Sequence, residues 1–245
     1  MDTEKVRETF RQPEAVEHYR RSAVDIGLWR SEEKLVRELF LEQETLLDLG
    51  CGAGRICLGL WELGYQHLLG VDYSPEMIGE ARRLANRLEY GIAFRKGDAT
   101  GLELDDGAFD GVIFGFNGLM QIPGRERRRG ALAEIHRVLR PGGAFLFTTH
   151  DREHRSFRAF LETHQLLWSR GEQSPELEEF GDNFFKAPEG QVFMHLPNRT
   201  EVLEDLAACG WTHEFDAMRS EIANEPADVR EFSDECRFWV ARKAD

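Results

Sequence analysis

The feature that most constrains the fold of this chain is the run LLDLGCGAGR, residues 46–55. An apolar strand ends at Leu49, and three glycines then turn the backbone into a helix: Gly50, Gly52 and Gly54. Glycine is needed there because tight turns use φ angles that other residues avoid, and because a side chain would block the approach of a ligand. A loop of this kind at a helix N-terminus can bind a dinucleotide or another nucleoside ligand.

The spacing of the glycines distinguishes these ligands. The dinucleotide fingerprint G-x-G-x-x-G would place glycine at position 55, where this chain has Arg55. The second predicted strand ends at Asp72, which agrees with the ~20-residue offset at which an acid meets a ribose. A carboxylate accepts two hydrogen bonds at once, so Asp72 suits the paired hydroxyls of a ribose. The pattern therefore favours a nucleoside ligand other than NADP, whose 2′-phosphate the carboxylate would repel.

A second carboxylate follows the third predicted strand, in Gly97-Asp98-Ala99. Adenine offers an exocyclic amine as a donor and a ring nitrogen as an acceptor. The Asp98 side chain and the Ala99 N–H are the complementary groups. Met77 either lies against the face of the purine or packs in the core.

From Glu44 onward, short apolar runs alternate with segments of helical periodicity, which is typical of a parallel sheet covered by helices. Ser74 is predicted to cap one helix and Asn198 to cap another, over 198–209. The sequence thus predicts a doubly wound α/β fold with a mostly parallel, seven-stranded sheet, in which the last two strands pair antiparallel at the sheet edge. The predicted strands are 45–49, 67–72, 91–95, 109–114, 143–150, 211–218 and 235–242.

Two regions lie outside this core of a single domain that spans residues 1–245. Residues 1–43 are predicted to form a helical N-terminal extension, with Ser31 capping a helix. Residues 151–190 form an aromatic-rich insertion after the fifth strand, and the apolar run at His195 is a candidate extra strand. Both regions should sit above the carboxyl ends of the strands, where ligands bind in open α/β sheets, with the insertion as a lid and pocket wall.

Composition and charge limit the kinds of partner that the protein can bind and the cell compartment that we expect for it. A net charge of −14 argues against nucleic acid, whose affinity depends on basic residues, and the one basic cluster, Arg125 with 127–129, is predicted to lie on the solvated face of a helix. No apolar run approaches the ~20 residues that span a bilayer, and the charged N-terminus lacks a secretory signal, so we expect a cytoplasmic protein without membrane contact. The four scattered cysteines indicate reduced thiols, and neither a disulfide nor a zinc site. Nothing in the sequence indicates an oligomeric state.

Taken in order, these motifs resemble class I S-adenosylmethionine-dependent methyltransferases. The resemblance is close over residues 44–150 and looser over 191–242. It rests on Asp48 to Gly54, Asp72, Gly97 to Ala99, Phe109-Asp110 and Leu139 to Gly143.

The resemblance implies S-adenosylmethionine as the cofactor and a set of residues that bind it. Gly50, Gly52 and Gly54 would line its methionine part. Asp72 would bind the ribose. Asp98 and Ala99 would bind the adenine. The remaining implied cofactor-binding residues are Asp48, Cys51, Tyr73 and Met77 around these motifs, Phe114, Phe116 and Asn117 along the other side, and Tyr19, Trp29 or Arg30 from the N-terminal extension.

Methyl transfer from a sulfonium requires mainly that a nucleophile be held in line with the S–CH₃ bond and that water be excluded. If the acceptor needs a general base, His150 at the end of the fifth strand is the first candidate. The match of residues 150–154 to the zinc-peptidase pattern H-x-x-E-H is rejected, because His150 ends a strand and both histidines would have to share a helix face. No metal is expected.

Other functions stay open on the same scaffold. An aminopropyltransferase has the same expected cofactor site, whereas Arg55 argues against an NAD-dependent dehydrogenase. A non-catalytic binding or scaffold protein that retains the fold is a further alternative. The intact glycine loop, Asp72 and Asp98 argue against it, because a retired site has no physical need for them together. The expected acceptor is a small, partly apolar or cationic molecule that the sequence does not identify.

Overall fold

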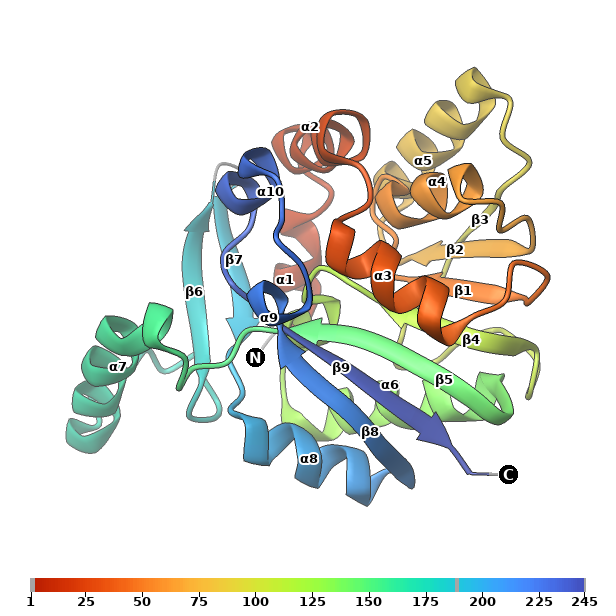
Figure 1. Ribbon diagram of the computed structural model, residues 1–245. Helices are drawn as coiled ribbons and strands as arrows, with labels where there is room; N and C mark the ends of the chain where they lie inside the picture. Colours follow the sequence, from red (N-terminus) through yellow and green to blue (C-terminus); the bar gives the residue numbers. More distant parts are fainter. Residues whose placement is uncertain (1–2, 188–189, 245) are drawn as a thin grey trace.

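The computed structural model describes residues 3–187 and 190–244, and a seven-stranded sheet forms its centre (Figure 1). The strand order is β3-β2-β1-β4-β5-β9-β8. The strands β3 to β5 in this order are parallel, and β9 runs antiparallel to both of its neighbours. The predicted α/β fold and the antiparallel pairing of the last two strands are confirmed. The strands are β1 (Leu46–Leu49), β2 (Leu68–Asp72), β3 (Ala93–Lys96), β4 (Phe109–Phe114), β5 (Leu139–Thr149), β8 (Trp211–Met218) and β9 (Arg237–Lys243).

Helices cover both faces of the sheet because alternate strand residues point to opposite sides. In β1, Leu47 and Leu49 belong to one buried cluster and Leu46 to another. Figure 1 shows α3, α4 and α5 on one side, and α6 and α8 on the other. The helices are α1 (Thr3–Thr9), α2 (Pro13–Arg21), η1 (Ser22–Ile26), α3 (Arg30–Leu39), α4 (Arg55–Glu62), α5 (Pro75–Leu88), η2 (Gly118–Gln121), α6 (Arg125–Val138), η3 (Arg155–Phe157), α7 (Arg158–Arg170), α8 (Arg199–Ala208), α9 (Arg219–Ile222) and α10 (Ala227–Phe232).

Two of the three predicted helix caps are confirmed. The Ser74 hydroxyl accepts the Met77 N–H at 3.2 Å, and the Asn198 side chain accepts the Glu201 N–H at 3.0 Å. The prediction for Ser31 is wrong, because this residue is buried in the first turn of α3, and its N–H is donated to the Glu225 carboxylate at 2.9 Å. The carboxylate of Glu225, distant in the sequence, therefore satisfies N–H groups at the start of this helix.

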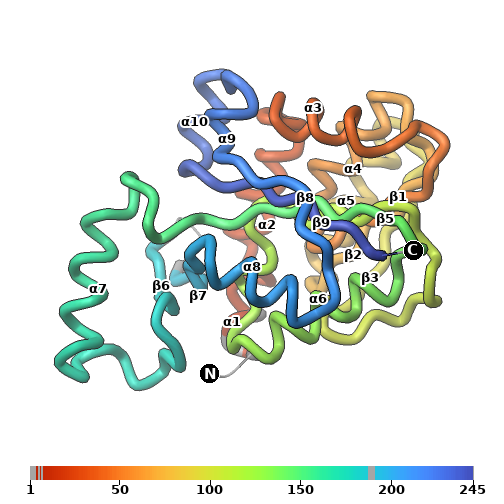
Figure 2. The backbone as a smooth tube through the Cα atoms, turned by 60° about the horizontal axis from the view of Figure 1, so that its bottom comes forward, coloured from red at the N-terminus to blue at the C-terminus, as the bar shows by residue number. Residues whose placement is uncertain are grey.

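The insertion after β5 forms α7 and a separate hairpin of two strands, β6 (Asp182–Ala187) and β7 (Gly190–His195). Figures 1 and 2 show α7 and the hairpin projecting from one side of the main sheet. The extra strand predicted at His195 is confirmed as β7. Aromatic side chains of the insertion pack on one another, as in the stacked Phe160 and His164 and the edge-on Trp168 and Phe180.

The prediction that the basic cluster of α6 lies on a solvated face holds for Arg127, which is exposed, and is wrong for the other three arginines. Arg128 is buried and forms an ion pair with Glu179 of the insertion at 2.9 Å. Arg125 and Arg129 both donate to Asp205 of α8. This face of α6 is covered by α8 and the insertion, and the arginines pair with carboxylates there. Within the described ranges, no helix combines the length and the apolar character that a membrane crossing requires.

Candidate cofactor site

A cavity of about 330 Å³ opens at the carboxyl ends of β1, β2 and β4. Its lining joins the glycine loop, the acids after β2 and β3, the segment after β4 and the N-terminal helices. The lining residues are Val6, Phe10, Tyr19, Leu49, Gly50, Gly52, Val71, Asp72, Tyr73, Met77, Gly97, Asp98, Ala99, Thr100, Phe114, Gly115, Phe116, Gly118, Gln121, Ile122, Pro123 and Arg127.

The glycine loop forms the floor of the cavity. Gly50 has a φ of +65°, and a Cβ there would lie 2.6 Å from Cε2 of Phe114. Glycine at this position therefore satisfies both the turn and the close approach of the ring. At Gly52 a Cβ would lie 3.3 Å from the Tyr19 ring, so the loop also meets the N-terminal extension.

Asp72 anchors this loop and also lines the cavity. Its two carboxylate oxygens accept the N–H of Gly52 at 2.9 Å and the N–H of Ser74 at 2.8 Å. Burial raises the pKa of Asp72, and the backbone N–H groups oppose that shift. Because an ionised carboxylate has about four acceptor positions, two hydrogen bonds leave capacity for a pair of hydroxyl groups.

The loop N–H groups are already used within the protein. Cys51 donates its N–H to Val71 O at 3.0 Å, and Gly54 donates to Cys51 O at 2.8 Å. With the Gly52 N–H held by Asp72, the loop has few donors for a pyrophosphate, and two carboxylates line the same cavity. This arrangement suits an uncharged ribose better than a dinucleotide phosphate.

Asp98 and Ala99 line the cavity on the β3 side. One oxygen of Asp98 accepts both the N–H and the hydroxyl of Thr100, at 2.9 and 2.8 Å. These bonds orient the carboxylate at the end of the strand. Met77 lines the same cavity from the first turn of α5, where its backbone is fixed by Ser74.

Three of the predicted cofactor-binding residues in the glycine motif are buried and do not line the cavity: Asp48, Cys51 and Gly54. One oxygen of Asp48 accepts the N–H of Cys57 at 3.2 Å, and the other oxygen has no hydrogen-bond partner among the described residues. Burial raises the pKa of Asp48 to about 7. Gly54 is the left-handed residue from which α4 begins. These buried positions support the glycine loop and do not line the cavity.

The N-terminal extension contributes Tyr19 to the lining, together with Val6 and Phe10, which sequence reasoning missed. The two other candidates from this region lie elsewhere. Trp29 is wholly buried between the guanidinium groups of Arg55 and Arg219, 4.8 and 5.0 Å from the ring centroid. Arg30 donates to the carbonyl of Asn224 at 3.0 Å. The aromatic side chain of Phe10 was a sequence signal that could have indicated this wall of the cavity.

His150 and Asn117 also lie outside the lining. The Nδ1 of His150 donates to the Glu235 carbonyl at 2.9 Å, because a carbonyl can only accept. Its Nε2 then accepts from Nδ2 of Asn117 at 3.3 Å. Burial lowers the pKa of His150, so the ring is neutral with both nitrogens occupied. Phe116, by contrast, lines the cavity next to Phe114. The part of the chain that the structure describes brings no histidine into the lining.

The sheet order, the glycine loop and the two strand-end acids together define an α/β domain whose cavity is suited to a nucleoside. Residues 46–143 match the family model described as a methyltransferase domain. Over this span the chain is a methyltransferase domain similar to the class I S-adenosylmethionine-dependent enzymes, as its motifs predicted.

Several known proteins are similar to this chain. A demethylmenaquinone methyltransferase of Thermus thermophilus is 35% identical over 126 residues, which cover 51% of this chain and 50% of that protein. A probable methyltransferase of Aspergillus luteorubrus is 26% identical over 81% of this chain and 74% of that protein. The chain thus spans about half the length of the first of these relatives. A crystal structure of a SAM-dependent methyltransferase from Methanosarcina mazei shares the fold, with a TM-score of 0.70, 20% identity, and coverage of 89% of this chain and 99% of that one.

Proposed function

We propose that this protein transfers the methyl group of S-adenosylmethionine to a small-molecule acceptor. The observation that carries the proposal is the pairing of Asp72 and Asp98 across one cavity whose floor is the glycine loop. Asp72 would hold the ribose hydroxyls. Asp98 and the Ala99 N–H would hold the adenine edge. Bound S-adenosylmethionine supplies a methyl group already activated by a positive sulfur.

The residues around the remaining space have two tasks, to orient the acceptor and to exclude water. The wall beyond the glycine loop is largely apolar, formed by Val6, Phe10, Tyr19 and Phe116. Tyr19 and Phe116 meet edge-to-face, with ring centroids 5.9 Å apart. An apolar wall favours a reaction in which positive charge disperses, and it helps to hold the reactants in line. In this proposal catalysis rests on proximity, and no dedicated base is required.

The small-molecule class of acceptor is supported by the limited volume of the cavity, about 330 Å³, and by similarity to a demethylmenaquinone methyltransferase. An aminopropyltransferase and a non-catalytic binding protein are the alternatives. Thermal unfolding separates the ligands: S-adenosylhomocysteine should raise the melting temperature, whereas NAD and decarboxylated S-adenosylmethionine should not. Stabilisation by decarboxylated S-adenosylmethionine alone would favour the aminopropyltransferase.

The assignment of Asp72 is tested by calorimetry with S-adenosylhomocysteine. Asp72→Ala should weaken binding by about 1–3 kcal/mol, the usual cost of leaving polar partners unpaired. Asp72→Asn, which keeps one acceptor oxygen, should lose less. Asp105→Asn, an exposed acid outside the cavity, is the matched control. Because Asp72 also holds the loop, unfolding of each ligand-free variant is measured in parallel. Unchanged affinity in Asp72→Ala would show that another group binds the sugar.

A further inference from the structure

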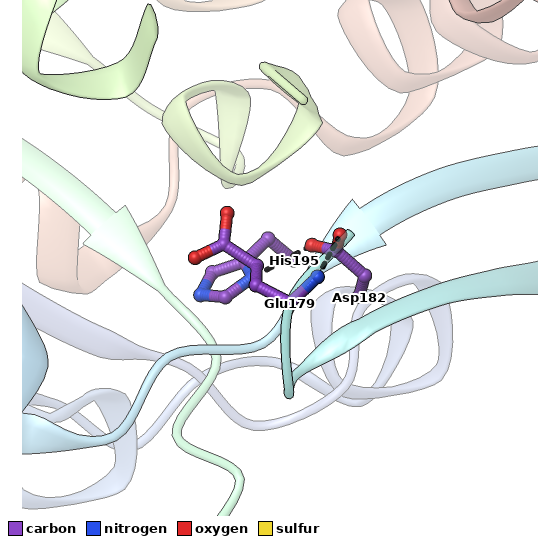
Figure 3. Close-up of side chains that lie close together, drawn as sticks. All are labelled: Glu179, Asp182 and His195. Atoms are coloured by element: carbon purple, nitrogen blue, oxygen red, sulfur yellow. Dashed lines mark hydrogen bonds and ion pairs between the residues drawn. The ribbon is translucent and has the colours of Figure 1, made fainter. Parts of the chain in front are cut away.

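A buried ionic network joins the inserted hairpin to the main domain through His195. Figure 3 shows the part of it that Glu179, Asp182 and His195 form. Nδ1 of His195 lies 2.8 Å from Oδ1 of Asp182, and Nε2 lies 2.5 Å from Oε1 of Glu201. Ionised carboxylates only accept hydrogen bonds, so both ring nitrogens carry a proton. His195, which is 1% exposed, is therefore held as an imidazolium.

The surrounding charges balance only in this protonation state. Arg128 donates to Glu179 at 2.9 Å, and Arg152 donates to Glu201 at 2.8 Å. With His195 protonated, three cations face three carboxylates; without its proton, the buried group carries a net negative charge. The neighbouring His164 accepts the N–H of Gly181 at 3.2 Å and adds no charge, because burial lowers its pKa. The groups that face His195 are Asp182 of β6, Glu201 of α8, Glu179 before β6, Arg128 of α6, Arg152 after β5 and His164 of α7.

The same cluster has the composition of a metal site, since the ligand atoms of Glu179, Asp182 and His195 lie within 4.8 Å of one another (Figure 3). Its hydrogen bonds argue against an ion. The second oxygen of Asp182 accepts the N–H groups of Glu178 and Glu179, both at 3.1 Å. The guanidinium of Arg128 lies against Glu179 and would repel a divalent cation. A proton on His195 accounts for the contacts.

This network lies behind two walls of the cofactor cavity. Arg128, held by Glu179, donates to the carbonyl of Ile122 at 3.3 Å, and Ile122 lines the cavity. On the other side, the carbonyl of Gln191 in β7 accepts the hydroxyl of Thr9 at 3.3 Å, next to the lining residue Phe10. The hairpin is thus a common support for the N-terminal wall and for the segment after β4.

We propose that protonated His195 is a positioning residue, which through the hairpin holds the N-terminal wall and the Ile122 wall together around the cofactor cavity. The inference rests on the proposed function for what the cavity binds. Losing the proton places Asp182 and Glu201 against an uncharged ring, loosens the hairpin and opens both walls. Cofactor binding and cavity closure then weaken together.

The direction of the pH dependence follows from the contacts. Burial favours the neutral ring, but the hydrogen bonds to Asp182 and Glu201 outweigh it and raise the pKa of His195 above 6.5. A raised pKa in the folded protein means that the stabilisation is complete below 6.5 and is lost as pH rises through the folded value. Affinity should therefore fall on the alkaline side.

The test measures the dissociation constant of S-adenosylhomocysteine from pH 6 to pH 9, and amide hydrogen exchange of ligand-free protein over residues 3–10 and 121–124. In the wild type, affinity should fall by about 5- to 150-fold with rising pH, the usual range for coupling between separate sites. His195→Gln should bind weakly at every pH, lack this dependence, and exchange faster in both segments. His154→Gln, which changes a histidine of the same insertion outside this network, should behave as the wild type.

Glu201→Gln keeps the test decisive if His195→Gln does not fold. Removing one carboxylate should shift the alkaline loss of affinity to lower pH. An unchanged pH profile in His195→Gln or Glu201→Gln would overturn the proposal, as would a rise in melting temperature with Zn²⁺ that His195→Gln abolishes. Absence of S-adenosylhomocysteine binding at every pH would instead refute the proposed function, and hydrogen exchange in the ligand-free protein would still decide the role of His195.

Discussion

The ring of Phe114 is held between two glycines, and this packing makes a quantitative prediction for Gly118→Ala. A Cβ at Gly118 would lie 2.1 Å from Cε2 of Phe114, and a Cβ at Gly50 would lie 2.6 Å from the same atom. Ordinary carbon contacts are about 3.5–4.0 Å, so an alanine at 118 overlaps the ring by more than ~1 Å. The ring cannot retreat toward Gly50, because the loop backbone stands there. It must move toward the cavity that it lines.

The expected cost is that of overpacking a buried site, about 1–3 kcal/mol in the free energy of unfolding. For a chain of this length each kcal/mol lowers the melting temperature by about 2–4 °C, so Gly118→Ala should melt about 2–12 °C below the wild type. Gly118 lies in η2 and does not need a left-handed φ, so the cost is steric. Affinity for S-adenosylhomocysteine should fall as well, because the displaced ring occupies part of the cavity.

Thermal and urea unfolding of four variants test this reasoning: Gly118→Ala, Gly79→Ala, Phe114→Leu, and Phe114→Leu combined with Gly118→Ala. Gly79→Ala is the matched control: this exposed glycine of α5 has no atom within 4 Å of its built Cβ, and alanine should stabilise the helix by about 0.5–1 kcal/mol. Phe114→Leu combined with Gly118→Ala should be less destabilising than the sum of the single changes, since the smaller side chain relieves the clash. If Gly118→Ala matched the wild type in stability and in affinity, the wedged position of Phe114 would be refuted.

Two further predictions concern buried charges. Burial raises the pKa of Asp48 to about 7, so its contribution to stability is fully present below the ordinary pKa of 3.8 and declines as pH rises toward 7. Asp48→Asn should remove that decline in urea unfolding measured from pH 4 to pH 8. An unchanged pH dependence in this variant would show that another group titrates. Glu32 and Arg55 form a buried ion pair at 2.6 Å. Glu32→Ala should lower the free energy of unfolding by about 3–5 kcal/mol, because it leaves the guanidinium without its partner charge. Glu33→Ala, which removes a partly exposed partner of Arg37 in the same turn, should lower it by less than about 1 kcal/mol in the same urea denaturation assay.

Much of the fold was predictable because its signals are local. Hydrophobic runs placed the strands within a few residues of their observed bounds, and Ser74 and Asn198 carry their caps in their own side chains. The prediction that Ser31 caps a helix was wrong because Glu225, which is distant in sequence, accepts the N–H of Ser31 at the start of α3. The prediction for Arg125, Arg128 and Arg129 of α6 was wrong for the same reason. The helix pattern shows a charged face but not the carboxylates of α8 and the insertion that cover it.

The candidate site divides in a similar way. Its floor and its two acids follow directly from strand-end motifs, whose geometry each strand fixes over a few residues. The opposite wall could not be derived in that way, and Trp29 shows why. Its indole was a reasonable partner for a cofactor by residue type, yet two arginines, one of them Arg219 near the C-terminus of the chain, bury it in the core.

The N-terminal wall depends on the rest of the molecule even more strongly. Helix α1 has 7 residues, too few to be stable alone, because nucleating a helix costs more than its first hydrogen bonds return. Its place is set from outside: Ser74 donates its hydroxyl to the Phe10 carbonyl at 3.2 Å, and β7 accepts from Thr9. One of these anchors belongs to the cap of α5 beside Asp72, and the other to the hairpin that His195 organises. Because the N-terminal wall is bonded to both the start of α5 and the hairpin, a shift of either element should move it. The position of α1 therefore follows from the assembled fold and not from its own sequence.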